Sequence, residues 1–176
     1  TISPTPTITF TPTIAATNTP FPFAEILFQF GDLPFSYGGK DPQVLDGNFY
    51  SQKLTRDGGE VGHIYLFLYV DKSQANNHFL TRSGQMEGLG HLRKAIFQTE
   101  KIEDLGDEST FWFVNLLMKR FIQWLPPSER EWEKFSAIGF VKCNAYVEIL
   151  DKSVGYLNQN LIDYAKTLDD RLTPLV

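Results

Sequence analysis

The feature that most constrains the fold is the segment VGHIYLFLYVD (61–71), which is apolar at almost every position. Its aromatic and branched residues favour a β-strand, in which successive side chains point to opposite faces. A strand that is apolar on both faces must be covered on both, or must offer one face to a ligand. The segment therefore predicts a strand that is either covered on both faces or presents one of them as a binding surface. One face would carry Ile64, Leu66, Leu68 and Val70, and the other His63, Tyr65, Phe67 and Tyr69.

Two interpretations of the aromatic face stay open at this point. Loops or the proline-rich N-terminal entry can cover it as a second small core layer. Alternatively, it is a docking face for a peptide, a sugar or a neighbouring subunit, because exposed apolar patches mark interaction sites. The candidate ligand-contacting residues are Tyr65, Phe67, Tyr69 and Tyr146.

The other segments of residues 23–176 predict one α+β domain, with a central antiparallel sheet and helices packed on it. The sequence RDGGE (56–60) indicates a hairpin turn centred on Asp57 and Gly58. The segment 95–115 reads as a second hairpin. The segment 135–150 alternates most clearly, and we expect it to be one strand with Cys143 in the core. This cysteine is the only one in the chain, which excludes an internal disulfide.

Two helices are expected to cover the sheet. The first spans 73–94, begins at a cap formed by Asp71 or Ser73, and should break near its glycines, because glycine disfavours helix interiors. The second lies in 154–172, where apolar residues recur every three or four positions. The inward positions are Ala75, Phe79, Met86, Leu89 and Leu92 in the first helix, and Leu157, Leu161, Tyr164, Ala165, Leu168 and Leu172 in the second.

Residues 1–22 differ from the rest of the chain. The first twenty residues carry no charge, and eight of them are threonine. Four prolines in this stretch favour an extended, semi-stiff conformation, and threonine-rich stretches can carry O-linked sugars in exported proteins. We therefore expect an extended arm or stalk between a membrane anchor and the domain, and an extracellular or periplasmic location. A low-complexity cytosolic tail is the alternative.

The arm also has the periodicity of a strand. In TITFTPTI (7–14) the apolar residues fall on every other position, so Ile8, Phe10 and Ile14 could share one face of an added edge strand. A partner subunit is the expected anchor for such a strand. These three residues are candidate partner contacts.

A second candidate contact surface lies in the segment 116–135, which is inserted between two predicted strands. Helical spacing places Leu117, Phe121, Trp124 and Leu125 on one face. A capping box follows at Ser128, so a short helix should begin there. The apolar face either folds onto its own domain, or docks on a partner or at a membrane surface.

The sequence offers little support for catalysis, a metal site or nucleic-acid binding. A net charge of −5 and the absence of a basic stripe argue against nucleic acid. The three histidines, His63, His78 and His91, lack the spacing of metal-binding motifs, and no phosphate-binding, dinucleotide-binding or nucleophile motif is present. We expect no cofactor and no enzymatic activity, with a hydrolase of an unrecognised type as the remaining alternative.

A family resemblance adds to these expectations. Asp32-Leu33-Pro34 is followed by a strand, a helix entered through Ser73-Gln74-Ala75, then Leu105-Gly106-Asp107-Glu108, a strand with Lys142-Cys143-Asn144-Ala145-Tyr146-Val147, and a helix with Tyr164-Ala165-Lys166. This order resembles the exported α+β domains of bacterial lipoproteins and the PsbP family, over residues 30–172. The family's usual basic–glycine pair is replaced by Lys142-Cys143-Asn144. The resemblance implies a PsbP-like sheet with helices packed on it and a role in assembly or binding.

Together these observations predict a non-catalytic, exported subunit of a cell-surface or membrane-associated assembly. Its partners would be other protein subunits, identical or different, bound through the N-terminal arm and the 116–135 segment. The alternative is a solute- or glycan-binding lipoprotein domain that uses the aromatic sheet face.

Overall fold

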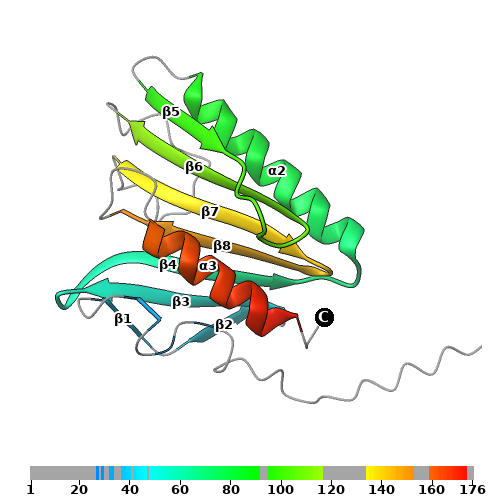
Figure 1. Ribbon diagram of the computed structural model, residues 1–176, viewed down its shortest axis with the longest axis horizontal. Helices are drawn as coiled ribbons and strands as arrows, with labels where there is room; N and C mark the ends of the chain where they lie inside the picture. The colour runs from blue at the N-terminus through cyan, green and yellow to red at the C-terminus, as the bar shows by residue number, and fades with distance from the viewer. Residues whose placement is uncertain are drawn as a thin grey trace, which may run out of the picture.

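The structure is a computed structural model that describes residues 27, 29, 32–33, 37–40, 42–46, 48–91, 95–116, 134–152 and 159–173. The N-terminal arm and residues 117–133 of the inserted segment lie outside the described residues. Within them, the chain forms an α+β fold with one large antiparallel sheet and two helices (Figure 1), so the predicted fold class is confirmed.

In the described part of the chain, eight strands form the sheet. In spatial order, β1 is followed by β3, β4, β8, β7, β6 and β5, while β2 also pairs with β3. Every pairing is antiparallel, so the short connections between neighbours are hairpins. The strands are β1 (Tyr37–Gly39), β2 (Gln43–Asp46), β3 (Phe49–Arg56), β4 (Gly59–Leu68), β5 (Ala95–Glu100), β6 (Glu108–Leu116), β7 (Lys134–Lys142) and β8 (Ala145–Asp151).

Two hairpin turns show how local sequence sets the strand order. The predicted turn at Asp57 and Gly58 joins β3 to β4, and both residues have positive φ, 51° and 80°. The expectation of one strand over 135–150 is wrong, because Cys143 has φ 49° and reverses the chain between β7 and β8. Cys143 is therefore a half-exposed turn residue rather than a core residue. The turn shifts the phase of the alternation, so that Phe140 shares a face with Val147. Both strands are buried on both faces, which is why the sequence reads as one continuous strand.

The two helices are α2 (Lys72–Gly90) and α3 (Gln159–Leu172). Asp71 caps α2, its side chain accepting a hydrogen bond of 2.9 Å from the backbone of Gln74. The expected break at the glycines is wrong, since α2 runs through them without interruption. No side chain or backbone crowds Gly84 or Gly88, and the buried stripe of Ala75, Phe79, Met86 and Leu89 outweighs their weak helix propensity.

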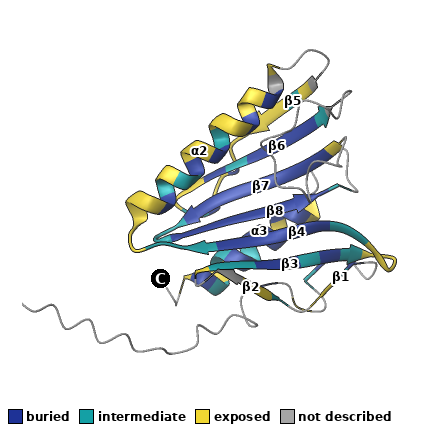
Figure 2. Ribbon diagram, turned by 180° about the vertical axis from the view of Figure 1, so that it is seen from behind, coloured by how far each residue is buried: buried dark blue, intermediate teal, exposed yellow. Residues whose placement is uncertain are grey.

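The helices lie on opposite faces of the sheet, as both views show (Figures 1 and 2). Alternation along each strand divides the core into two clusters. On β8, Val147 and Ile149 pack with α3, whereas Tyr146 and Leu150 pack with α2. β4 has core clusters on both faces, although the strand ends at Leu68 and Val70 is exposed. In the described residues its aromatic face packs in part against α2, rather than against the loops or N-terminal entry expected to cover it.

A buried ion pair connects α2 to the sheet. The guanidinium of Arg82 forms a bidentate pair with the carboxylate of Glu148 on β8, at 2.8 Å and 2.6 Å. The Tyr146 hydroxyl donates to the same carboxylate at 2.5 Å. Because both charged groups are almost fully buried, neither can exchange its partner for water. The pair therefore determines which part of the sheet α2 covers.

Two carboxylates from the resemblance motifs also make long-range contacts. Asp32 forms a bidentate pair with Arg171 of α3, at 2.6 Å and 2.8 Å, which joins the start of the domain to its last helix. Asp107 accepts a hydrogen bond of 2.9 Å from the backbone of Cys143, at the β7–β8 turn. Both residues thus stabilise the packing of segments that are far apart in sequence.

We predict that Glu148→Gln destabilises the fold by about 3–5 kcal/mol, because it leaves the Arg82 guanidinium buried without its counter-charge. Urea unfolding measures the change in the free energy of unfolding. Arg56→Gln is the matched control, since its pair with Asp57, at 3.9 Å, is exposed, and it should cost less than about 1 kcal/mol. Equal effects of the two substitutions would contradict the role assigned to the buried pair.

Candidate aromatic binding site

The candidate site lies on the sheet face that carries α2, beyond the area that the helix covers. Among the strands, α2 contacts β5, β6, β7 and β8. On the same face, β4 and β3 carry Tyr65, Phe67 and Phe49, whose registers place them side by side. The aromatic face predicted from 61–71 therefore extends from beneath the helix to a part of the sheet that α2 leaves open.

Stacked rings form a row along these strands. Phe49 and Phe67 stack with their centroids 4.1 Å apart and their planes within 7°. Tyr65 lies 5.8 Å from Phe49, and its ring stacks on His63 at 5.5 Å. We refer to Phe49, Tyr65 and Phe67 as the aromatic row. Parallel and offset contacts of this kind add to the stabilisation from area burial.

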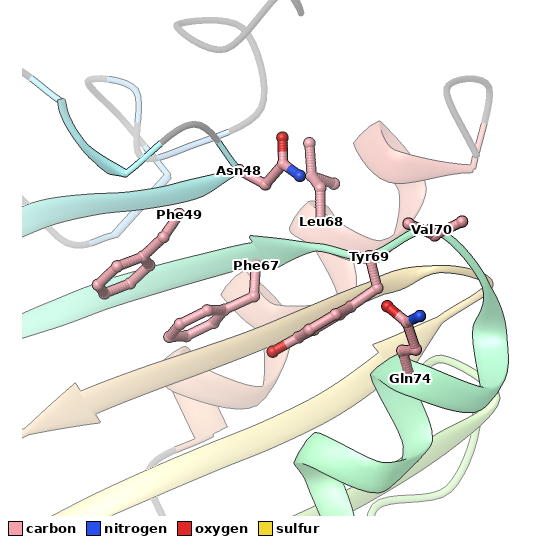
Figure 3. Close-up of a pocket in the computed structure, with 7 residues that line it drawn as sticks. All are labelled: Asn48, Phe49, Phe67, Leu68, Tyr69, Val70 and Gln74. Carbon is pink, nitrogen blue, oxygen red and sulfur yellow. The ribbon is translucent and has the colours of Figure 1, made fainter. Parts of the chain in front are cut away.

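A hollow of about 310 Å³ lies where the aromatic row reaches the end of β4. Its size is at the lower end of the range typical of small-molecule sites. In Figure 3 the rings of Phe49, Phe67 and Tyr69 point to the same side of the strands, and the amide of Gln74 lies close to Tyr69. We call it the aromatic hollow. It is lined by Asn48, Phe49, Phe67, Leu68, Tyr69, Val70 and Gln74.

Local structure holds two of these lining residues in place. Tyr69 follows the end of β4, and Asn144 of the β7–β8 turn brackets its backbone with two hydrogen bonds, of 2.9 Å and 2.8 Å. Gln74 lies in the first turn of α2, where the Asp71 cap binds its backbone amide. The helix start and the neighbouring turn thus shape the rim of the aromatic hollow.

His78 connects the aromatic hollow to the buried ion pair. Its ring lies 4.5 Å from both Phe67 and Tyr146, and its Nδ1 is hydrogen-bonded to the Tyr69 hydroxyl. Burial lowers the pKa of His78, with Glu148 opposing the shift and Arg82 adding to it. Burial also raises the pKa of Tyr69. Near pH 7 both groups are therefore neutral, and the tautomer of the imidazole sets which of the two donates the proton.

The residues predicted for this face divide into two groups. Phe67 and Tyr69 line the aromatic hollow. Tyr146 is fully buried and Tyr65 nearly so, which makes them part of the core under and beside the hollow. The other candidate contacts, Ile8, Phe10, Ile14, Leu117, Phe121, Trp124 and Leu125, lie outside the described residues.

Sequence reasoning missed several residues at or behind the site, and four of them carry a signal in the sequence. Phe49 belongs to a weakly alternating segment, and pairing with β4 brings it beside Phe67. His78 and Arg82 occupy the inward stripe of α2, but that stripe was read from its apolar residues alone. Gln74 follows the cap by three residues. Apolar periodicity alone does not identify polar residues that share a buried face, as His78 and Arg82 do.

The described part of the chain holds no group of three or more metal-binding side chains. Within the same residues, no helix combines the length and apolar character needed to cross a membrane. The chemistry available at the aromatic hollow is therefore ring stacking and amide hydrogen bonding. Comparison of the chain with models of protein families, with characterised proteins and with solved structures gave no match.

Acidification should destabilise the fold through the buried His63 and the half-buried His78. Burial is the largest cause of the lowered pKa of both His78 and His63, so the unfolded chain, with a histidine pKa of about 6.5, takes up protons first as pH falls. The stability that the neutral histidines contribute is therefore fully present above a pH of about 6.5 and is lost as the pH falls from there towards the lower pKa of the folded state. Urea unfolding at pH 7.5 and 5.5 measures the loss, which should be smaller in His78→Gln. An unchanged loss in this variant would show that His78 does not contribute.

Proposed function

We propose that this chain is a non-catalytic, exported binding domain and that the aromatic hollow holds a ring of a saccharide. The observation that carries the proposal is the line of Phe49, Phe67 and Tyr69 rings on one side of the sheet, half-exposed beside the Gln74 amide. Sugar rings present apolar C–H faces and hydroxyl groups, which match an aromatic surface flanked by an amide that can both donate and accept.

The electrostatics of the lining favour a neutral ring at this position. All seven lining residues are uncharged. A charged group of a ligand would therefore lose its hydration there without gaining a counter-ion. Rigid aromatic side chains lose little conformational entropy when they contact a ligand. A shallow site with these properties suits selective, reversible binding of a sugar unit.

Substitutions at the aromatic hollow should weaken saccharide binding. Phe67→Leu removes a stacking surface and Gln74→Ala removes the amide, and each should raise the Kd for neutral oligosaccharides roughly 2- to 10-fold. Titration calorimetry with a panel of neutral tetrasaccharides measures the effect. Leu80→Ala, on the exposed side of α2, is the matched control and should bind as the native chain does. If no member of the panel binds, the proposal fails.

A second candidate function is a protein-binding subunit, and the sheet edge at β5 favours it. Among the described strands β5 pairs only with β6, and Ile96 on it is 51% exposed. An unpaired edge accepts an added strand, and residues 7–14 have the alternation of one. We propose that the arm of one copy adds to β5 of another, as part of a tethered cell-surface assembly. The 116–135 segment would supply further partner contacts.

Sedimentation velocity tests this second function. The full chain should self-associate, and either deletion of residues 1–22 or Ile96→Lys should weaken association at least about tenfold, since a buried lysine charge disfavours pairing. Val44→Lys is the matched control, because Val44 is 63% exposed on β2 at the opposite end of the sheet. A monomeric full chain, or equal effects of Ile96→Lys and Val44→Lys, would contradict it.

We further propose that the architecture is PsbP-like. Three features support this assignment: helices on both faces of one antiparallel sheet, the Asp32–Arg171 pair, and the Asp107 contact to the β7–β8 turn. The last two place residues of the resemblance motifs at long-range contacts.

A further inference from the structure

A second hollow, of about 190 Å³, lies on the neighbouring part of the sheet. It is lined by Lys40, Gln43, Ser51 and Lys53, so every lining side chain can donate a hydrogen bond and two carry a positive charge. Ser51 is buried, whereas Lys40 and Gln43 are exposed. We call it the lysine hollow. Its composition contrasts with the uncharged aromatic hollow.

Strand register places both hollows on the same face. Ser51 pairs with Tyr65 and Phe49 pairs with Phe67, so the β3 residues Phe49, Ser51 and Lys53 share the face of the aromatic row. Gln43 of β2 pairs with Ser51, and the backbone amide of Lys40 bonds to the carbonyl of Lys53. Along β3, Phe49 and Ser51 are successive positions on one face, about 7 Å apart. One ligand can therefore reach both hollows.

The charges at the lysine hollow favour an anion. The Lys53 ammonium pairs with Glu60 at 2.8 Å, and Glu60 also contacts His63 at 3.1 Å. The pairing with Lys53 lowers the pKa of Glu60, and burial lowers the pKa of His63, so near pH 7 the glutamate is charged and the imidazole neutral. Lys53 and Glu60 then offset each other. In the described part of the chain the Lys40 ammonium has no carboxylate partner, which leaves one net positive charge.

We propose that the lysine hollow binds the anionic group of an acidic saccharide, a carboxylate or a sulfate ester, while a neighbouring ring of the same ligand occupies the aromatic hollow. This inference rests on the proposed saccharide-binding function and narrows its substrate class. Lys40 supplies the charge that no carboxylate of the described residues offsets. Lys53, held by Glu60, and the Ser51 hydroxyl supply fixed donors.

The experiment compares two matched probes and one simple ion. Calorimetry at low salt measures the Kd of a uronic-acid tetrasaccharide and of its neutral counterpart, and NMR follows the backbone amide of Ser51 during titration with inorganic sulfate. The variants are Lys40→Gln and, as the matched control, Lys101→Gln, which removes an exposed lysine just after β5 at the far edge of the sheet.

The native chain and Lys101→Gln should bind the acidic probe roughly 3- to 10-fold more tightly than the neutral one, with the preference decreasing at high salt. Lys40→Gln should lose that preference and keep its affinity for the neutral probe. Equal binding of the two probes, or a preference that survives Lys40→Gln, overturns the inference while the proposed function stands. If neither saccharide binds, the proposed function fails. In that case the sulfate titration tests the anion site alone. The site is supported if sulfate shifts the NMR signal of the Ser51 amide in the native chain but not in Lys40→Gln, and any other result overturns it.

Discussion

The Arg82–Glu148 pair sets the position of α2, and through it the division of one sheet face into a buried and an open part. A buried guanidinium and carboxylate need each other, because neither can recover its hydration. Glu148 lies on β8, so the helix that supplies Arg82 must cross that strand. A single helix is narrower than an eight-stranded sheet, and α2 accordingly covers β5 to β8 and stops short of β3.

Because of this division, the solvent exposure of the aromatic side chains increases along β4 towards its end. Tyr65 is nearly buried within the aromatic row, and Phe67 and Tyr69 reach the aromatic hollow. His78 joins the two parts, since it contacts Tyr69 on one side and Tyr146, which binds Glu148, on the other. A change in the packing of α2 would therefore change the shape of the aromatic hollow, because Gln74 lines it and His78 contacts two of its rings.

The two hollows differ in charge and polarity, and this difference matches a ligand with a neutral ring next to an anionic group. The uncharged one offers rings, and the polar one offers cations and a hydroxyl, on the same face of β3. Net charge gives no hint of this arrangement, since the chain as a whole is acidic. Among the described residues, the charge balance of the lysine hollow depends on the pairing of Glu60 with Lys53 rather than with Lys40. The β3–β4 hairpin and the loop after β1 set this pairing.

The sequence by itself determined the α+β class, the hairpin at Asp57 and Gly58, a helix start at Asp71 or Ser73, and the inward positions of both helices within the described residues. Each of these follows from contacts between residues close along the chain. It also determined that 61–71 has two apolar faces. Only the tertiary structure decided which part of the aromatic face stays open, because that depends on where α2 packs, including its salt bridge to a residue 66 positions away. It likewise separated β7 from β8 at Cys143, since both strands are buried on both faces and no apolar/polar pattern marks the phase shift at the turn. Strand pairing brought Phe49 and the lysine hollow beside β4, and the packing of α2 brought Gln74 there.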